Sequence, residues 1–176
     1  MNKNWYAVCT KAQCEKKVVS LLTKKKIENF CPLNRSVLNN QSSRRKVLQE
    51  PLFPSFVFVY LSQGEMYAVQ QTSDVISFLY WLGKPAVIKN VEIEHIHLFV
   101  NSYFNIKLEK TAVNPAGTLS LIKEPGIELN SREFSAGTKC IKITLPSLGF
   151  CITADTVNNS ADIINLTFEN SKILAQ

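Results

Sequence analysis

Histidine is scarce in this sequence, which holds two among 176 residues. His95 and His97 fall two positions apart in a stretch that is predicted to be helical, so their side chains would point about 200° apart around the helix axis. Imidazoles on opposite sides of a helix do not share a metal ion. The pair therefore predicts surface or packing roles and no metal site.

Catalytic and metal-binding motifs are absent as well. The sequence holds no P-loop, no GxGxxG, no GxSxG and no HExxH. The cysteines form no CxxC pair, are odd in number and are widely spaced, which is typical of reduced thiols rather than of a disulfide framework or a zinc site. They are Cys9, Cys14, Cys31, Cys140 and Cys151. We therefore expect a binding protein without a cofactor rather than an enzyme.

Long apolar runs are also missing. No stretch of about 18 apolar residues occurs, so neither a membrane-spanning helix nor a membrane partner is predicted. The N-terminus, MNKNWYAVCTKAQCEKK, lacks the apolar core of a signal peptide. Together with the reduced thiols, these absences predict a cytoplasmic protein.

Positive charge is present and unevenly distributed. Residues 1–50 carry eleven Lys or Arg and three Glu, which gives +8, whereas residues 51–176 carry nine basic and eleven acidic residues, which gives −2. The sum is the net charge of +6. A basic first part favours a surface that faces nucleic acid. A merely solvated basic face is the alternative that charge alone leaves open.

Apolar periodicity predicts alternating strands and helices in residues 1–106. The predicted strands are residues 5–10, 29–33, 55–61 and 75–81, and the predicted helices are residues 11–26, 64–72 and 93–103. Residues 36–46 are polar and predict a loop or hairpin tip. This order fits an α+β sandwich of the ferredoxin-like type.

The second part of the chain has a different pattern. Residues 107–117 contain Pro and Gly without periodicity, which predicts a linker between two domains, 1–106 and 118–176. Beyond it, short β-rich runs at 119–122, 138–145 and 150–153 predict a small β-barrel.

The stretch EPLFPSFVFVYL, residues 50–61, is apolar at every position of its second half. In a strand, Phe56, Phe58 and Tyr60 point to one face, while the intervening Val and Leu point to the other. Three occupants of the aromatic face remain open: the stacked bases of single-stranded RNA, a helix of a partner protein, or a helix of this chain itself. An exposed patch of these rings beside Trp5 and Phe53 would be large for a free surface.

Several segments resemble the N-terminal domain of the NusG family of transcription elongation factors. They are WYAVCTKAQCEKKVVSLL, FCPL, RRKVLQEPLFPSFVFVYL and TSDVISFLYWLGKPAVI, which match in order and spacing over about residues 4–104. The segment 50–59 is similar to the specialised paralogues, RfaH and the UpxY antiterminators of capsule operons. The resemblance implies a bacterial antitermination factor that serves a specific operon, such as one for capsular polysaccharide.

The resemblance also implies partners and site residues. In the family, the aromatic sheet surface docks on the clamp helices of the RNA polymerase β′ subunit, and the opposite edge approaches the β subunit. The implied polymerase-binding residues are Trp5, Cys9, Phe53, Phe56, Phe58 and Tyr60. The implied contacts with non-template DNA or nascent RNA are Lys11, Gln13, Lys16, Lys17, Arg44 and Arg45. Residues 138–155 resemble the last strands of a KOW barrel, which implies ribosomal protein S10 or Rho as partners of the second domain.

Overall fold

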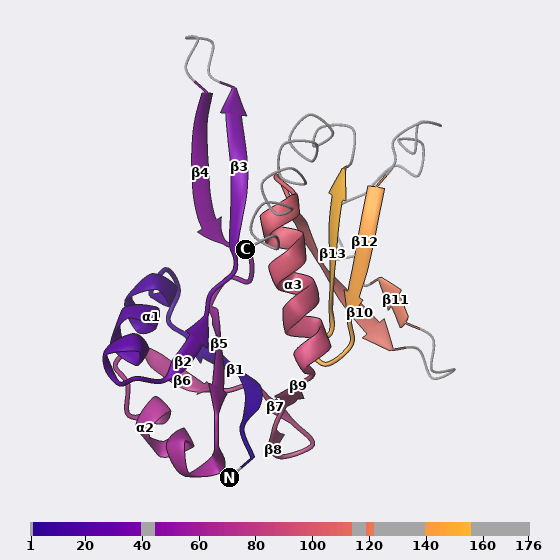
Figure 1. Cartoon of the computed structure of the whole chain (residues 1–176). Helices are drawn as coiled ribbons and strands as arrows, with labels where there is room; N and C mark the ends of the chain where they lie inside the picture. Colours follow the sequence, from indigo (N-terminus) through magenta and orange to yellow (C-terminus); the bar gives the residue numbers. More distant parts are fainter. Residues whose placement is uncertain (1, 40–44, 114–118, 122–139, 156–176) are drawn as a thin grey trace, which may run out of the picture. The chain divides into compact units, whose positions relative to one another are not determined.

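The computed structural model describes residues 2–39, 45–113, 119–121 and 140–155. The chain divides into two compact units (Figure 1). The first unit comprises Met1–Leu33 and Glu50–His97, and the second comprises Asn34–Gln49 and Leu98–Gln176. The boundary falls inside one helix, α3, which spans Asn90–Ser102.

An antiparallel sheet forms the centre of the first unit. Its strand order is β2-β5-β1-β6, and a short strand, β9, also pairs with β1. The strands are β1 (Asn4–Thr10), β2 (Glu28–Phe30), β5 (Phe56–Leu61), β6 (Val75–Phe78) and β9 (Val87–Ile88). The strands predicted at 5–10 and 55–61 are confirmed, as is the α+β class of this part of the chain.

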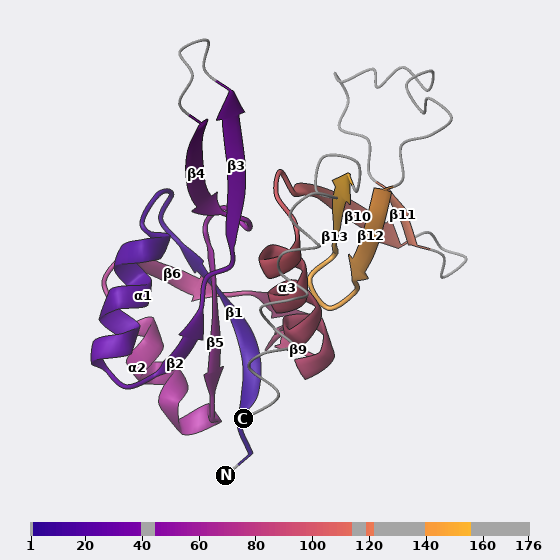
Figure 2. The ribbon, with the colours of Figure 1, turned by 45° about the horizontal axis from the view of Figure 1, so that its top comes forward.

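Two helices cover one face of this sheet (Figure 2). Helix α1 spans Glu15–Lys24, and α2, Met66–Gln70, follows a short 3-10 turn, η1, at Gln63–Glu65. The core between helices and sheet consists of Tyr6, Val8, Val18, Leu22, Ile27, Val57, Val59, Leu61, Val69 and Phe78. The Val and Leu positions of the 56–61 stretch therefore face the core, as the alternation predicts.

Helix α1 begins four residues later than predicted. Gln13 has a φ of +61°, which lies outside the helical region and delays the helix start to Glu15. Glu15 is 4% exposed, and its Oε1 accepts a hydrogen bond of 2.6 Å from the backbone N–H of Ser55. The backbone N–H of Thr10 donates to the Ser55 carbonyl at 2.8 Å. These contacts fix the start of β5 against the start of α1.

A small hairpin interrupts the edge of the sheet. The predicted strand at 75–81 ends at Phe78, and the chain then forms β7 (Tyr80–Trp81) and β8 (Lys84–Pro85), which pair with each other. The turn of this hairpin lies at Leu82 and Gly83.

The second unit begins with the hairpin of β3 (Leu33–Asn39) and β4 (Arg45–Pro51). Asn34 holds its base, since the side-chain amide donates to the Ile106 carbonyl at 2.8 Å and accepts from the Ile106 N–H at 3.0 Å. The Arg35 guanidinium donates to the carbonyls of Val100 and Asn101 at the end of α3, and lies 4.1 Å from the ring centroid of Phe104. A cation at the carbonyl end of a helix is favourable.

A second antiparallel sheet has the order β11-β10-β13-β12. Its strands are β10 (Lys107–Val113), β11 (Leu119–Leu121), β12 (Cys140–Leu145) and β13 (Phe150–Asp155). The linker prediction is wrong for 107–113, which form a strand because they pair with β13. The strands predicted at 119–122, 138–145 and 150–153 are confirmed for 119–121, 140–145 and 150–153, while residues 122, 138 and 139 lie outside the described residues. No closed barrel is seen in the described strands, so the barrel remains unconfirmed.

None of the helices among the described residues is long and apolar enough to cross a membrane.

Candidate functional site

The aromatic face of the first sheet is formed by β1, β2 and β5. The strand register pairs Trp5 with Tyr60, Cys9 with Phe56, and Phe30 with Phe58. Paired residues in antiparallel strands point to the same face. The structure therefore brings the rings predicted from β1 and β5 together. It adds Phe30, which the sequence interpretation had placed in a strand without a role.

Two of the rings that the resemblance implies as polymerase contacts are buried in this structure. Phe58 is 0% exposed and Phe53 is 2% exposed. Their ring centroids are 5.3 Å apart at an interplanar angle of 88°, the edge-to-face geometry that aromatic pairs favour. Phe53 lies in the turn before β5, where the Phe56 N–H donates to its carbonyl. These two rings stabilise the fold and do not form part of an accessible surface.

The first part of α3, up to His97, helps to cover this face. The ring of His97 stacks on that of Phe30 with centroids 3.6 Å apart and an interplanar angle of 12°. Ile93 and Ile96 of the same helix are 3% and 0% exposed. The sequence predicts their apolar stripe but does not say which surface it covers. Of the three occupants that were left open, a helix of this chain takes the part of the face around Phe30.

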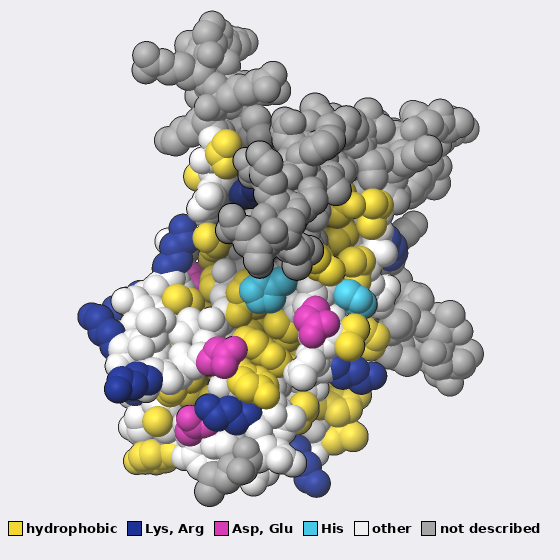
Figure 3. Space-filling model, viewed as in Figure 1, with side chains coloured by type: hydrophobic (Ala, Val, Ile, Leu, Met, Phe, Trp, Pro, Cys, Tyr) yellow, Lys and Arg dark blue, Asp and Glu magenta, His cyan; other side chains and the backbone are white. Residues whose placement is uncertain are grey.

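Part of the aromatic face stays accessible. Trp5, Cys9, Phe56 and Tyr60 are each half-buried. The rings of Trp5 and Tyr60 are in contact, with centroids 5.2 Å apart. Figure 3 shows hydrophobic side chains over β1 and β5, with acidic and His side chains around them. Burial raises the pKa of the Cys9 thiol, opposed in part by a hydrogen bond with Ser77.

The stacked His97 predicts a pH dependence of stability. Partial desolvation lowers the pKa of the otherwise exposed His97 below its ordinary 6.5, so the folded protein favours the neutral imidazole where the unfolded chain takes up a proton. The free energy of unfolding should therefore decrease as the pH falls from 7.5 to 5.5. In urea titrations, a His97→Phe variant, which keeps the stacking, should lose less stability over this range. Equal losses in both proteins would contradict this role of His97.

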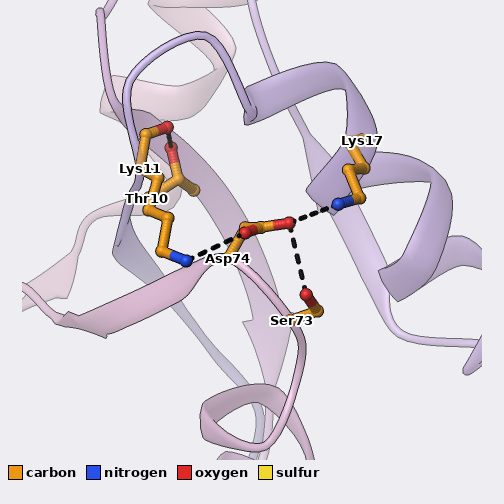
Figure 4. Close-up of polar contacts among 5 residues, drawn as sticks. All are labelled: Thr10, Lys11, Lys17, Ser73 and Asp74. Carbon is orange, nitrogen blue, oxygen red and sulfur yellow. Dashed lines mark hydrogen bonds and ion pairs between the residues drawn. The ribbon is translucent and has the colours of Figure 1, made fainter.

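A second candidate surface joins the end of β1 to the start of α1. The Lys11 and Lys17 ammonium groups approach the Asp74 carboxylate from two sides, at 3.3 and 2.6 Å (Figure 4). The Ser73 hydroxyl also donates to Asp74, at 3.2 Å. Hydrogen bonds from Lys17 and Lys11 lower the pKa of Asp74, and the same pairing with Asp74 raises the pKa of Lys17. We refer to Lys11, Lys17 and Asp74 as the Lys–Asp cluster.

The cluster remains open to solvent on its basic side. The side chains of Lys11 and Lys17 are 66% and 63% exposed, whereas that of Asp74 is 11% exposed. Gln13, in the connection between β1 and α1, and Lys16, in the first turn of α1, are also exposed. Exposed ammonium groups can attract phosphates, although Asp74 cancels part of their charge. The sequence interpretation missed Asp74, because nothing local in the chain links it to Lys17.

Two predicted nucleic-acid contacts cannot be placed beside this cluster. Arg44 lies outside the described residues, and Arg45 begins β4 in the hairpin of the second unit. Their role stays a prediction.

No group of three or more His, Cys, Asp and Glu side chains within the described ranges could hold a metal ion. Burial, followed by the charge of Glu15, raises the pKa of Cys31 to about 11, so its thiol is poorly suited to act as a nucleophile.

These features place an accessible aromatic patch and an exposed basic cluster on one small α+β domain. A family model described as "Transcription termination factor nusG" matches residues 3–97, just over half of the chain. The chain belongs to the NusG family. Members of this family are transcription factors that bind RNA polymerase, which places the chain among transcription elongation factors.

A solved structure of a bacterial NusG supports the fold. The chain is similar to the structure titled "Domain interaction in Thermotoga maritima NusG", at 20% sequence identity and a TM-score of 0.50, over 88% of this chain and 93% of that chain. The structure titled "MjSpt4:Spt5 complex conformation A" matches at 19% identity over 85% of this chain and 98% of that chain, with a TM-score of only 0.32. No curated protein matches the sequence.

Proposed function

We propose that this chain is a specialised antitermination factor, which binds the β′ clamp helices of RNA polymerase through the accessible part of its aromatic face. The observation that carries the proposal is the half-buried Trp5–Tyr60 pair, in a family whose members bind RNA polymerase. A coiled coil presents ridges of apolar side chains, and aromatic anchors suit such a partner.

The burial data narrow the residues that make this contact. Trp5, Phe56 and Tyr60 touch the partner, with Cys9 beside them, while the buried rings of Phe53 and Phe58 pack against each other inside the fold. The chemistry of the surface requires no catalytic group.

Antitermination follows from binding alone. A factor that contacts both sides of the polymerase main channel favours its closed state, and a ligand shifts an equilibrium by the difference of its affinities for the two states. Pausing and termination require the clamp or the upstream bubble to rearrange, so both become less frequent. The resemblance of residues 50–59 to RfaH and UpxY supports action on a specific operon, such as a capsular polysaccharide operon.

The Lys–Asp cluster contacts the non-template DNA strand in this proposal. Its lysines attract phosphates, which gives salt-dependent affinity and little choice of sequence. Gln13 and Lys16 flank it, and Arg44 and Arg45 are further proposed contacts with nucleic acid, on the resemblance alone. The second unit is the proposed contact for ribosomal protein S10 or Rho, on the resemblance of residues 138–155 to KOW strands.

Retention of RNA polymerase tests the proposal. The immobilised full chain should retain purified bacterial core polymerase after nuclease treatment, which removes bridging RNA and DNA. The alternative function, a single-stranded RNA-binding module that uses the same rings, predicts the opposite result. Retention of a free single-stranded RNA with no retention of core polymerase would replace the first function by the second.

Removal of the Asp74 charge should strengthen nucleic-acid binding. In the Asp74→Asn variant, Lys11 and Lys17 lose their carboxylate partner and become available to phosphates. Affinity for a labelled single-stranded DNA should rise, and each added phosphate contact should steepen the plot of log K against log salt by about 0.7. Fluorescence anisotropy at several salt concentrations measures both quantities.

A matched control separates the cluster from net charge. Glu28→Gln removes one negative charge at an exposed position of β2, away from the cluster. It should leave the salt slope unchanged. If both variants steepen the slope equally, the cluster has no special role in binding.

A further inference from the structure

The β7–β8 hairpin is a separate two-stranded sheet inserted between two strands of the first sheet. Strands β6 and β9 both pair with β1, and the β7–β8 hairpin lies between them in the chain. Leu79 closes the base, since its N–H donates to the Ala7 carbonyl at 2.8 Å and its carbonyl accepts from the Ala86 N–H at 2.8 Å. The turn is two residues long, between the pair Trp81 and Lys84.

Large apolar side chains lie open on this hairpin. Trp81 is 71% exposed, Leu82 is 88% exposed and Tyr80 is 49% exposed. Figure 3 shows hydrophobic side chains where Figure 1 places β7 and β8, with Lys or Arg side chains beside them. Single exposed apolar residues are common, but three in succession at a turn are typical of a contact surface.

The turn itself carries backbone strain. Leu82 and Gly83 have φ values of +49° and +75°. Positive φ at both central residues is the pattern of a type I′ turn, where Asn-Gly is preferred. A bulky side chain at positive φ is unfavourable, so Leu is a poor choice for folding at this position. Residues that are unfavourable for folding and exposed to solvent occur at functional surfaces.

Charge identifies the chemistry of the partner. Residues 75–91 contain no Asp or Glu, and the exposed Lys84 and Lys89 make the segment basic. Trp81 and Lys84 are a cross-strand pair, which places the indole and the ammonium group on the same face of the hairpin, with Cβ atoms about 5 Å apart. A nucleotide offers the two matching groups, a flat base for the indole and a phosphate for the lysine.

We propose that the β7–β8 hairpin binds single-stranded nucleic acid, with one unpaired base stacked on Trp81 and a neighbouring phosphate held by Lys84. Leu82 contacts the edge of the same base. Bases in a duplex are stacked on each other and do not offer a free face, so the hairpin selects unpaired strands. The inference is separate from the proposed docking on RNA polymerase and from the Lys–Asp cluster, because it uses none of their residues.

Tryptophan fluorescence and oligonucleotide affinity test the inference together. The probe is a labelled mixed-sequence DNA of twelve nucleotides, alone or annealed to its complement. The single strand should quench the emission of the full chain, and this quenching should be lost in Trp81→Ala. Affinity for the single strand should fall about tenfold or more in Trp81→Ala and much less in Trp81→Phe, which keeps an aromatic face. Lys84→Gln should lower the salt slope by about 0.7.

Controls make the outcome decisive. Ile76→Ala removes another apolar side chain, 65% exposed on β6, and should leave affinity unchanged. Equal affinity of Trp81→Ala and the unaltered chain, or quenching by the duplex as strong as by the single strand, overturns the inference. A blue shift of the tryptophan emission on addition of vesicles of phosphatidylserine and phosphatidylcholine, with no quenching by the single strand, also overturns the inference. Trp81→Ala should retain core polymerase as the unaltered chain does. Failure of the hairpin inference is therefore distinguishable from failure of the proposed docking on RNA polymerase.

Discussion

Replacement of Phe58 by Ala is expected to lower the free energy of unfolding by about 3–5 kcal/mol. Phe58 lies in the middle strand pair of the first sheet, is 0% exposed, and contacts the rings of both Phe30 and Phe53. Removal of the ring leaves a cavity and removes two aromatic contacts at once. Urea unfolding followed by circular dichroism measures the change.

Phe56 provides the matched comparison for this prediction. It has the same side chain and the same strand, and it points to the same face, but it is half-buried. Phe56→Ala should therefore destabilise the fold clearly less than Phe58→Ala. If the two variants unfold at the same urea concentration, Phe58 is not the buried support that the structure describes.

Tyr60→Ala is expected to weaken binding to RNA polymerase by about 2 kcal/mol, which is roughly thirtyfold, if the ring is a central anchor. Tyr60 contacts Trp5 and stays half-buried in the free chain, so its loss removes contact area with a partner at a modest cost to the fold. The measurement is titration of labelled chain with core polymerase, without nucleic acid.

The same titration needs a control for unspecific loss of apolar surface. Ile76→Ala changes an exposed residue at the opposite edge of the sheet from β2 and should bind as the unaltered chain does. Phe53→Ala is unsuitable, since Phe53 is buried and its loss would act through stability. Unchanged affinity in both Tyr60→Ala and a Trp5→Ala variant would remove the docking surface from consideration.

Local sequence patterns predict the aromatic face of the sheet, but they do not predict that α3 packs on part of it. Alternation along β5 is a property of neighbouring residues, so the shared direction of Phe56, Phe58 and Tyr60 can be inferred from six letters of sequence. The stacking of His97 on Phe30 joins residues far apart in the chain. An apolar helical stripe shows that something is covered but not which surface it is.

Contacts between residues far apart in the chain also explain other differences between the sequence-based predictions and the structure. Asp74 contacts Lys17 across 57 positions of the chain, and no local sequence pattern predicts this contact. Residues 107–113 are a strand because β13 offers them a partner, although KLEKTAV shows little alternation of its own. The late start of α1 depends on the positive φ of Gln13, a backbone state that the helical periodicity of the following residues does not reveal.

The position of α3 has a practical consequence for anyone who dissects this chain. The family match ends at residue 97, in the middle of a helix that continues to Ser102. A fragment truncated there would lose the carbonyls of Val100 and Asn101 that accept from Arg35, and the backbone of Ile106 that pairs with the Asn34 side chain. The shortest sensible expression fragment therefore extends past residue 106, and proteolytic fragments that stop earlier should release the β3–β4 hairpin from its anchor.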